Sequence, residues 1–233
     1  MTSSLLYYLS DSAFPSGSFC FSNGVEVLKN IGNIEQLEPF IIDLLMQAAS
    51  ELPFVLVAYD NSEDTKVLMK LSRAFSILNI NDSRLKSSLQ QGKSYYMAVC
   101  KSFFLEEGHY IHTLKVLFDK GLQSFIPCIY GVFSKQIGLS KSDSLQLYLL
   151  TFLKNSINAA VRLDLMDAYY SQLFMLNQDK LIKQLVDLYI DFTVDPAFTI
   201  EEFLNEALVD QLNPSLDIFQ GLHDNLNTKL FIN

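Results

Sequence analysis

The sequence predicts an all-α protein, built as one compact domain of about eight to ten helices over residues 1–233. Apolar residues recur at helical spacing along most of the chain, and no segment sustains the alternation that is typical of strands. Only nine glycines and six prolines occur, which favours long helices with short connections. Hydrophobic residues make up 49% of the chain and charged residues 18%, the opposite of the balance in disordered proteins.

The apolar spacing places the individual helices. One helix is expected to begin near Val25, and a later one carries an apolar stripe over residues 37–48. Pro53 suits the first turn of a helix over 54–59, because the N–H that proline lacks would have no helical partner there. The same spacing predicts further helices over 67–78, 145–163, 181–192 and 200–208.

Polar residues and glycines mark where several of these helices begin and end. Gly138 suits the end of one helix, and the stretch from Ser140 to Asp143 supplies an N-cap for the next. Thr199 followed by Glu202 is a capping box, with an Asp-Pro turn signal a few residues earlier. These signals agree with the helices that the apolar spacing predicts.

The net charge of −9 comes from one segment. Between Gln184 and Thr228 there are nine acidic residues and no lysine or arginine, whereas the rest of the chain has seventeen residues of each sign. A surface that binds nucleic acid needs the opposite charge, so we expect no nucleic-acid partner. The segment is either a solvated helix face or a docking surface for a basic partner.

The cysteines and the apolar segments indicate the compartment. Cys20, Cys100 and Cys128 are too widely spaced for a zinc site or a disulfide framework, so we expect buried free thiols in a reducing compartment. The N-terminus lacks a basic region with a cleavage site, and polar residues interrupt the longer apolar stretches. We therefore expect a cytoplasmic protein with no membrane partner.

Two short patterns imitate functional motifs. Gly92-Lys93-Ser94 matches the end of a phosphate-binding loop, but that loop requires a glycine where Ser87 stands, so no nucleotide site is predicted. His109 and His112 could share one helix face, but a metal site needs further ligands, and histidines in a loop or at a helix end are the simpler interpretation. No nucleophile elbow, metalloprotease helix or dinucleotide fingerprint occurs. We expect no catalysis, no metal and no cofactor.

Two apolar stretches near the chain ends do not fit the helical pattern. Residues 14–24 combine a proline and two glycines with Phe19 and Phe21, which predicts either a special turn or aromatic side chains presented to a partner. The C-terminal stretch contains Leu230-Phe231-Ile232, although chain ends are usually polar. These side chains should be covered, either by the chain's own surface or by another protein.

These stretches, and two segments between them, resemble the UreF family of urease accessory proteins. Gln91-Gly92 resembles a central family segment, and Ser156–Leu163 is similar to the family's helices of small residues. The N-terminal signature of the family is met by Pro15, Gly17, Phe19, Ser22, Gly24 and Glu26. The C-terminal signature is met by Leu216-Asp217-Ile218, His223, Leu226 and Leu230-Phe231. The likeness runs in order over nearly the full length.

The resemblance implies an all-α protein, often a homodimer, that helps to insert nickel into urease without catalysis of its own. It implies a complex with the accessory protein UreD, called UreH in some systems, and with the GTPase UreG, which carries nickel toward apo-urease. In this family the C-terminal tail, here about residues 214–233, helps to bind UreD. The expected partner-binding residues are Phe19, Phe21, Glu26, His223, Lys229, Leu230 and Phe231. The expected structural motif residues are Pro15, Gly17, Ser22, Gly24 and Arg162.

Two positions depart from the family pattern. Lys229 stands where the family commonly has arginine, and lysine lacks the planar fork of a guanidinium group. The family tends to keep a glycine near the position of Asp167, which puts the local turn or dimer surface in question.

The residues also leave two other classes of function open. One is a helical binding module, unrelated to urease, that holds a basic partner through its acidic segment. The other is an enzyme whose site assembles from residues on different helices. Family likeness favours the urease accessory function over both.

Overall fold

The computed structural model describes residues 2–11, 13–31, 34–79, 82–102, 114–115, 118–119, 121–207 and 214–232. Within these ranges the chain is helical and has no strand, which confirms the all-α expectation. The α-helices are α1 (Thr2–Ser10), α2 (Val25–Asn30), α3 (Leu37–Ala49), α4 (Leu52–Asp60), α5 (Thr65–Leu78), α6 (Asp82–Ser102), α8 (Ile126–Gln136), α9 (Lys141–Arg162), α10 (Ala168–Asn177), α11 (Asp179–Tyr189), α12 (Ile200–Glu206) and α13 (Pro214–Leu222). Three 3₁₀ turns cover Ser18–Cys20, Ile34–Gln36 and His223–Asn225.

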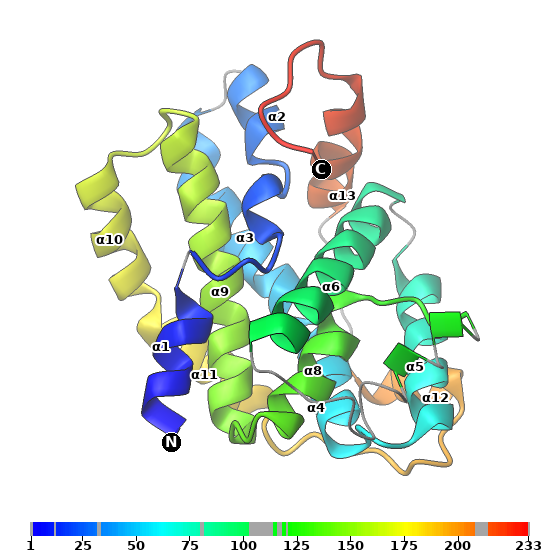
Figure 1. The fold of residues 1–233 in the computed structure, drawn as a ribbon. Helices are drawn as coiled ribbons and strands as arrows, with labels where there is room; N and C mark the ends of the chain where they lie inside the picture. Colours follow the sequence, from blue (N-terminus) through cyan, green and yellow to red (C-terminus); the bar gives the residue numbers. More distant parts are fainter. Residues whose placement is uncertain are drawn as a thin grey trace.

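The long helix α9 forms the centre of the molecule. It packs against α1, α2, α3, α10 and α11, while α4 and α6 pack against α8, and α12 packs against α5 (Figure 1). Helix α13 and the C-terminal tail lie beside α2, close to the N-terminal loop that leads into it. The N-terminal loop (residues 14–24) and the C-terminal tail therefore meet on one side of the fold, whereas the N-terminus itself lies on the opposite side (Figure 1).

The core is built around α4, whose residues from Leu52 to Tyr59 are all buried. The Phe54 ring packs edge-on against the rings of Phe75 and Phe203, with centroid separations of 5.3 and 4.9 Å. Such aromatic pairs contribute about 0.5–1.5 kcal/mol each beyond the area that they bury. Among the described residues, Leu37–Asp60 is the one stretch long and apolar enough to cross a membrane, and 78% of its apolar window is buried inside this fold. Burial of this kind is typical of core helices.

The helix boundaries expected from capping residues are confirmed. The Ser140 hydroxyl accepts the backbone N–H of Asp143 at 3.0 Å, and Thr199 forms its capping box with Glu202. Pro53 lies in the first turn of α4. Helix α11 ends at Tyr189, so the expected extension to Phe192 is wrong. The expected helix end at position 208 lies outside the described residues.

The motif-like patterns have structural explanations. Gly92-Lys93-Ser94 lies inside α6, where helical backbone N–H groups cannot wrap a phosphate. His109 and His112 fall outside the described residues, and the described part of the chain holds no group of three or more potential metal ligands. Cys128 is buried, and burial raises the pKa of its thiol. Cys20 is exposed and Cys100 is half-buried, so the expectation of three buried thiols is confirmed for Cys128 alone.

The turn after α9 uses a non-glycine residue where helix ends favour glycine. Asp164 has φ +58°, and its N–H and the next one bond back to the carbonyls of Val161 and Ala160. The same arrangement ends α8, where Gly138 takes the left-handed position. Asp167, where the family pattern raised a question, instead has an extended backbone and caps α10 by accepting two N–H groups.

We expect Asp164→Gly to stabilise the protein by about 0.5–1 kcal/mol, because it removes the cost of a side chain in the left-handed region. Asp167→Ala should instead destabilise it by about 1 kcal/mol through the loss of the N-cap. Urea denaturation of both variants measures the difference. A stabilising effect of both, or of neither, would contradict this account of the turn.

Candidate functional site

The N-terminal loop has a backbone shape that requires glycine at two places. Gly17 and Gly24 have φ of +79° and +94°, where side chains are disfavoured. A Cβ atom at Gly17 would lie 2.5 Å from the Cβ of Ser94 on α6. The loop is thus a special turn packed against a helix, one of the two alternatives that the sequence left open.

The loop and α2 are fastened to α9. The side-chain amide of Asn23 donates to the hydroxyl of Ser156 at 3.3 Å, and the Lys29 ammonium donates to the carbonyl oxygen of Leu163 at 2.7 Å. A cation at a helix C-terminus also offsets the partial negative charge of the free carbonyls. These contacts fix α2 relative to the end of the central helix.

The C-terminal tail docks on this fixed segment through the carboxylate of Glu26. That carboxylate accepts the backbone N–H of Leu230 at 2.6 Å and of Phe231 at 3.3 Å. The backbone N–H of Ile232 donates to the carbonyl oxygen of Cys20 at 2.8 Å. Hydrogen bonds to a buried carboxylate are about twice as strong as neutral ones, so Glu26 is the main anchor of the tail.

His223 completes the anchor from the turn that follows α13. Its side chain is fully buried, and its Nε2 lies 2.8 Å from Oε2 of Glu26. The carboxylate only accepts, so the proton belongs on Nε2. The other ring nitrogen, Nδ1, has no hydrogen-bond partner among the described residues. One buried carboxylate therefore joins α2, the turn after α13 and the tail.

Arg162, the last residue of α9, contacts two aromatic rings. Its guanidinium carbon is 3.9 Å from the ring centroid of Phe19 and 4.4 Å from that of Phe231. Its Nη1 also donates to the carbonyl oxygen of Phe19 at 2.7 Å. The guanidinium therefore contacts both the N-terminal loop and the C-terminal tail.

The partner-binding residues expected from the sequence divide into two groups. Phe21, Glu26, His223 and Phe231 are buried in this single chain. Phe19 and Leu230 each remain 55% exposed, Ile232 is 71% exposed, and Lys229 is also exposed. We call the four exposed residues, Phe19, Lys229, Leu230 and Ile232, the joined-ends surface. In the tail, Phe231 is thus covered by its own chain, whereas its neighbours Leu230 and Ile232 stay exposed.

The residues of the expected structural motif also lie in this region. Ser22 is fully buried below the loop, whereas Pro15 is exposed on it. Gly17, Gly24 and Arg162 have the backbone and stacking roles described above. The signature residues that are far apart in sequence therefore form one connected structure.

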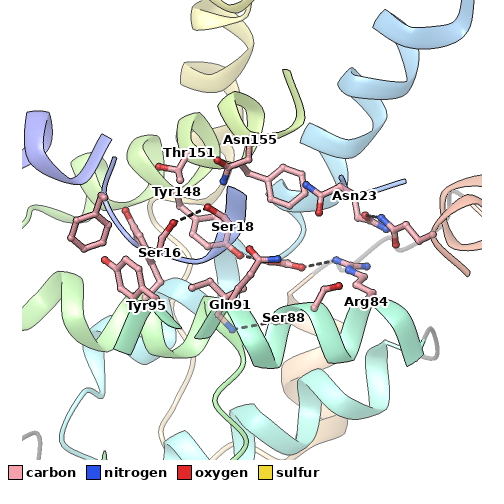
Figure 2. A pocket seen from close by; sticks show the side chains of 18 of the residues that line it. Ser16, Ser18, Asn23, Arg84, Ser88, Gln91, Tyr95, Tyr148, Thr151 and Asn155 are labelled. Carbon is pink, nitrogen blue, oxygen red and sulfur yellow. Dashed lines mark hydrogen bonds and ion pairs between the residues drawn. The ribbon is translucent and has the colours of Figure 1, made fainter. Parts of the chain in front are cut away.

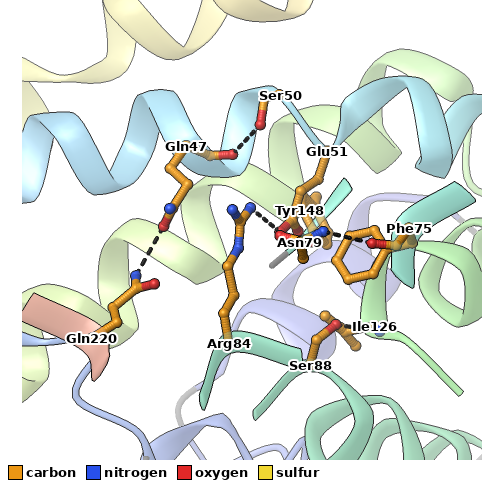
Figure 3. A network of polar contacts seen from close by, with 10 residues as sticks. All are labelled: Gln47, Ser50, Glu51, Phe75, Asn79, Arg84, Ser88, Ile126, Tyr148 and Gln220. Carbon is orange, nitrogen blue, oxygen red and sulfur yellow. Dashed lines mark hydrogen bonds and ion pairs between the residues drawn. The ribbon is translucent and has the colours of Figure 1, made fainter. Parts of the chain in front are cut away.

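A buried polar network elsewhere in the fold was not anticipated from the sequence. Glu51, at the junction of α3 and α4, lies 2.7 Å from the Arg84 guanidinium on α6 and accepts the hydroxyl of Tyr148 on α9 (Figure 3). Burial, and then the Glu51 charge, raises the pKa of Tyr148 well above its ordinary value, so the phenol stays neutral and donates. Only the rarity of arginine, with three in the chain, could have directed attention to Arg84.

A cavity lies between this network and the N-terminal loop. Its volume is about 80 Å³, and Ser16, Ser18 and Asn155 lie on the side of the loop and α9 (Figure 2). Tyr95 and Tyr130 line its wall with ring centroids 5.2 Å apart, and the Tyr95 hydroxyl lacks a partner among the described residues. The charges of Glu51 and Arg84 offset each other here, so the cavity has no strong net charge.

The exposed face of α10 is a second apolar feature. The helix contains no charged residue, and its exposed residues include Tyr169, Tyr170, Leu173 and Leu176. Exposed apolar patches of this kind commonly mark protein interfaces.

Known proteins match the chain over nearly its full length. The family described as UreF matches residues 31–177. Urease accessory protein F of Arabidopsis thaliana is 28% identical over 236 residues, which cover 97% of this chain and 90% of the relative. Urease accessory protein UreF of Trichodesmium erythraeum is 25% identical, with 98% and 95% covered. A urease accessory protein UreF-like protein of Schizosaccharomyces pombe is 27% identical, with 96% and 94% covered.

Proposed function

This chain belongs to the UreF family of urease accessory proteins, and from that premise we propose that it is a non-catalytic scaffold for nickel insertion into urease. In this proposal it binds a UreD-like protein (UreH in some systems), recruits or regulates a UreG-like GTPase, and reaches apo-urease through that complex. It acts in the cytoplasm and needs no cofactor. Membership of an accessory family supports a role in urease maturation and displaces the alternative of an acidic binding module unrelated to urease.

The joined-ends surface is the observation that carries the proposal. Three large apolar side chains, Phe19, Leu230 and Ile232, are exposed on the N-terminal loop and on the tail that is hydrogen-bonded to it. Large apolar and aromatic side chains next to a basic group are typical of residues that dominate protein interfaces. Lys229 supplies the basic group, on the exposed side of the docked tail.

We assign different roles to the two groups of expected partner-binding residues. Phe19, Lys229 and Leu230 would contact the UreD-like protein directly. The other four residues would contribute to binding by holding the loop and the tail in position. They are the buried Phe21, Glu26, His223 and Phe231. Preorganisation of this kind lowers the entropic cost of binding.

The apolar face of α10 supports the proposal of a homodimer. A second copy of the chain would repel the first near the acidic segment from Gln184 to Thr228, which carries the whole net charge of −9. Helix α10 offers an apolar face without any charge, so two copies could meet there with little repulsion. The exposed acids of α11 and α12, such as Asp187 and Glu201, then remain a solvated surface.

Co-purification tests the proposed function. The tagged chain is expressed with folded UreD-like and UreG-like proteins, and a matched preparation omits the UreD-like protein. We expect both partners to be retained in the first preparation, and urease activity of cells to be lost when this chain is deleted and restored when it is returned. Retention of neither folded partner, or full urease activation without the chain, would contradict the proposal.

A further inference from the structure

We infer that Arg162 couples the N-terminal loop to the C-terminal tail, so that docking of the tail and placement of Phe19 form one cooperative unit. The inference deepens the proposed function, because it identifies what holds the loop and the tail together as one partner-binding surface. The binding experiment below rests on that proposed function. The structural arm of the inference concerns the free chain alone.

The first step is that Phe19 depends on Arg162 for its position. The Phe19 side chain is more than half exposed, and its ring stacks on the guanidinium at 3.9 Å. The same guanidinium donates to the Phe19 carbonyl oxygen at 2.7 Å, so it holds both the ring and the backbone of this residue. An exposed aromatic ring with such support keeps one orientation instead of sampling several.

The second step is that the tail contacts the same guanidinium group. The Phe231 ring lies 4.4 Å from the guanidinium and is 97% buried when the tail is docked. A planar guanidinium can stack on two rings at once, whereas a lysine ammonium is a point charge that cannot. Movement of either ring would therefore cost one of the two contacts that this exposed guanidinium makes.

The third step is that Arg162 is itself fixed. It is the last residue of α9, and the following turn is closed by hydrogen bonds from Asp164 and Leu165 back into the helix. Lys29 also binds the carbonyl oxygen of Leu163. The guanidinium thus extends from a rigid support, and its contact with one ring preorganises it for contact with the other.

Glu26 cannot provide this coupling, although it anchors the tail. Its carboxylate binds the backbone of Leu230 and Phe231 and the ring of His223, but it makes no recorded contact with Phe19. The hydrogen bond between Ile232 and Cys20 reaches the residue after Phe19, and it fixes backbone only. Within the described part of the chain, Arg162 is the side chain that contacts the rings of both Phe19 and Phe231.

Hydrogen exchange of the tail amides in the free chain tests the coupling. The N–H groups of Leu230, Phe231 and Ile232 are bonded in the docked state, so their protection reports docking. We expect Arg162→Lys to lower their protection about tenfold, because it keeps the charge and removes the planar stack. Arg73→Lys, at an exposed site on α5, is the matched control and should leave protection unchanged.

Phe19→Leu gives the decisive comparison, since it changes an exposed side chain that makes no recorded contact with the tail. Coupling predicts that Phe19→Leu lowers tail protection about threefold in the native background. In a chain that already carries Arg162→Lys, it should have no further effect. Unchanged tail protection in Phe19→Leu, or an equal loss in both backgrounds, would overturn the inference. Circular dichroism of each variant confirms that the helices are intact.

The binding arm uses the UreD-like protein as the probe. Coupling predicts that Phe19→Leu and removal of Lys229–Asn233 weaken binding less together than the sum of their separate effects. Additive losses would overturn the coupling while leaving the scaffold function standing. Absence of any binding by the native chain would instead count against the proposed function, and the exchange experiment would still decide the coupling.

Discussion

Replacing Arg84 with leucine is expected to lower the free energy of unfolding by about 3–5 kcal/mol, the usual cost of leaving a buried charge unpaired. The Glu51 carboxylate would keep only the Tyr148 hydroxyl among its recorded partners, at the buried junction of α3 and α4. Because the network joins that junction to α6 and α9, its loss affects the packing around the central helix. The effect is the largest that we expect from one substitution away from the apolar core.

Urea denaturation measures this loss, with Arg73→Leu as the control because Arg73 is exposed on α5. The control should change stability by less than about 0.5 kcal/mol. The double variant Glu51→Leu with Arg84→Leu should recover much of the loss, since it removes both buried charges together. A loss below about 1 kcal/mol for Arg84→Leu alone would show that the pair contributes little to the fold.

Replacing Glu26 with glutamine is expected to release the tail and to weaken binding of the UreD-like protein by about 10- to 100-fold. The carboxylate accepts three N–H groups, from His223, Leu230 and Phe231. A neutral amide of the same shape keeps one acceptor oxygen and turns an NH₂ group toward N–H donors. One charge-assisted hydrogen bond contributes about 1.5–3 kcal/mol, which corresponds to the stated loss in affinity.

Hydrogen exchange and calorimetric titration measure the two parts of this prediction. Tail amides should exchange at least about tenfold faster in Glu26→Gln, while amides of the buried helix α4 keep their protection. Glu35→Gln, an exposed position, is the matched control for both readouts. Native tail protection with reduced affinity would refute the anchor role, because Glu26 would then act on the partner in some other way.

Local features of the fold were predictable from the sequence because they depend on neighbours along the chain. The stripe over 37–48 became α3, and the cap residues Ser140 and Thr199 begin α9 and α12. Each of these signals lies within one or two turns of a single helix. Helical periodicity and capping chemistry need no knowledge of the tertiary structure.

The features that were missed depend on contacts between distant segments. Glu51, Arg84 and Tyr148 come from three parts of the chain, and no local spacing relates them. The sequence also could not tell that Phe231 would be buried while its neighbours Leu230 and Ile232 stayed exposed. That division arises because the tail binds through its backbone to Glu26 and Cys20, which orients alternate side chains inward and outward.

Calorimetric titration of the UreD-like protein with the full chain and with a chain lacking Lys229–Asn233 tests the central claim most directly. The account predicts that the shortened chain binds at least about tenfold more weakly, since it lacks most of the joined-ends surface and retains a native helical signal. Equal affinity of the two chains would contradict it, because the partner would then recognise some other face of the molecule.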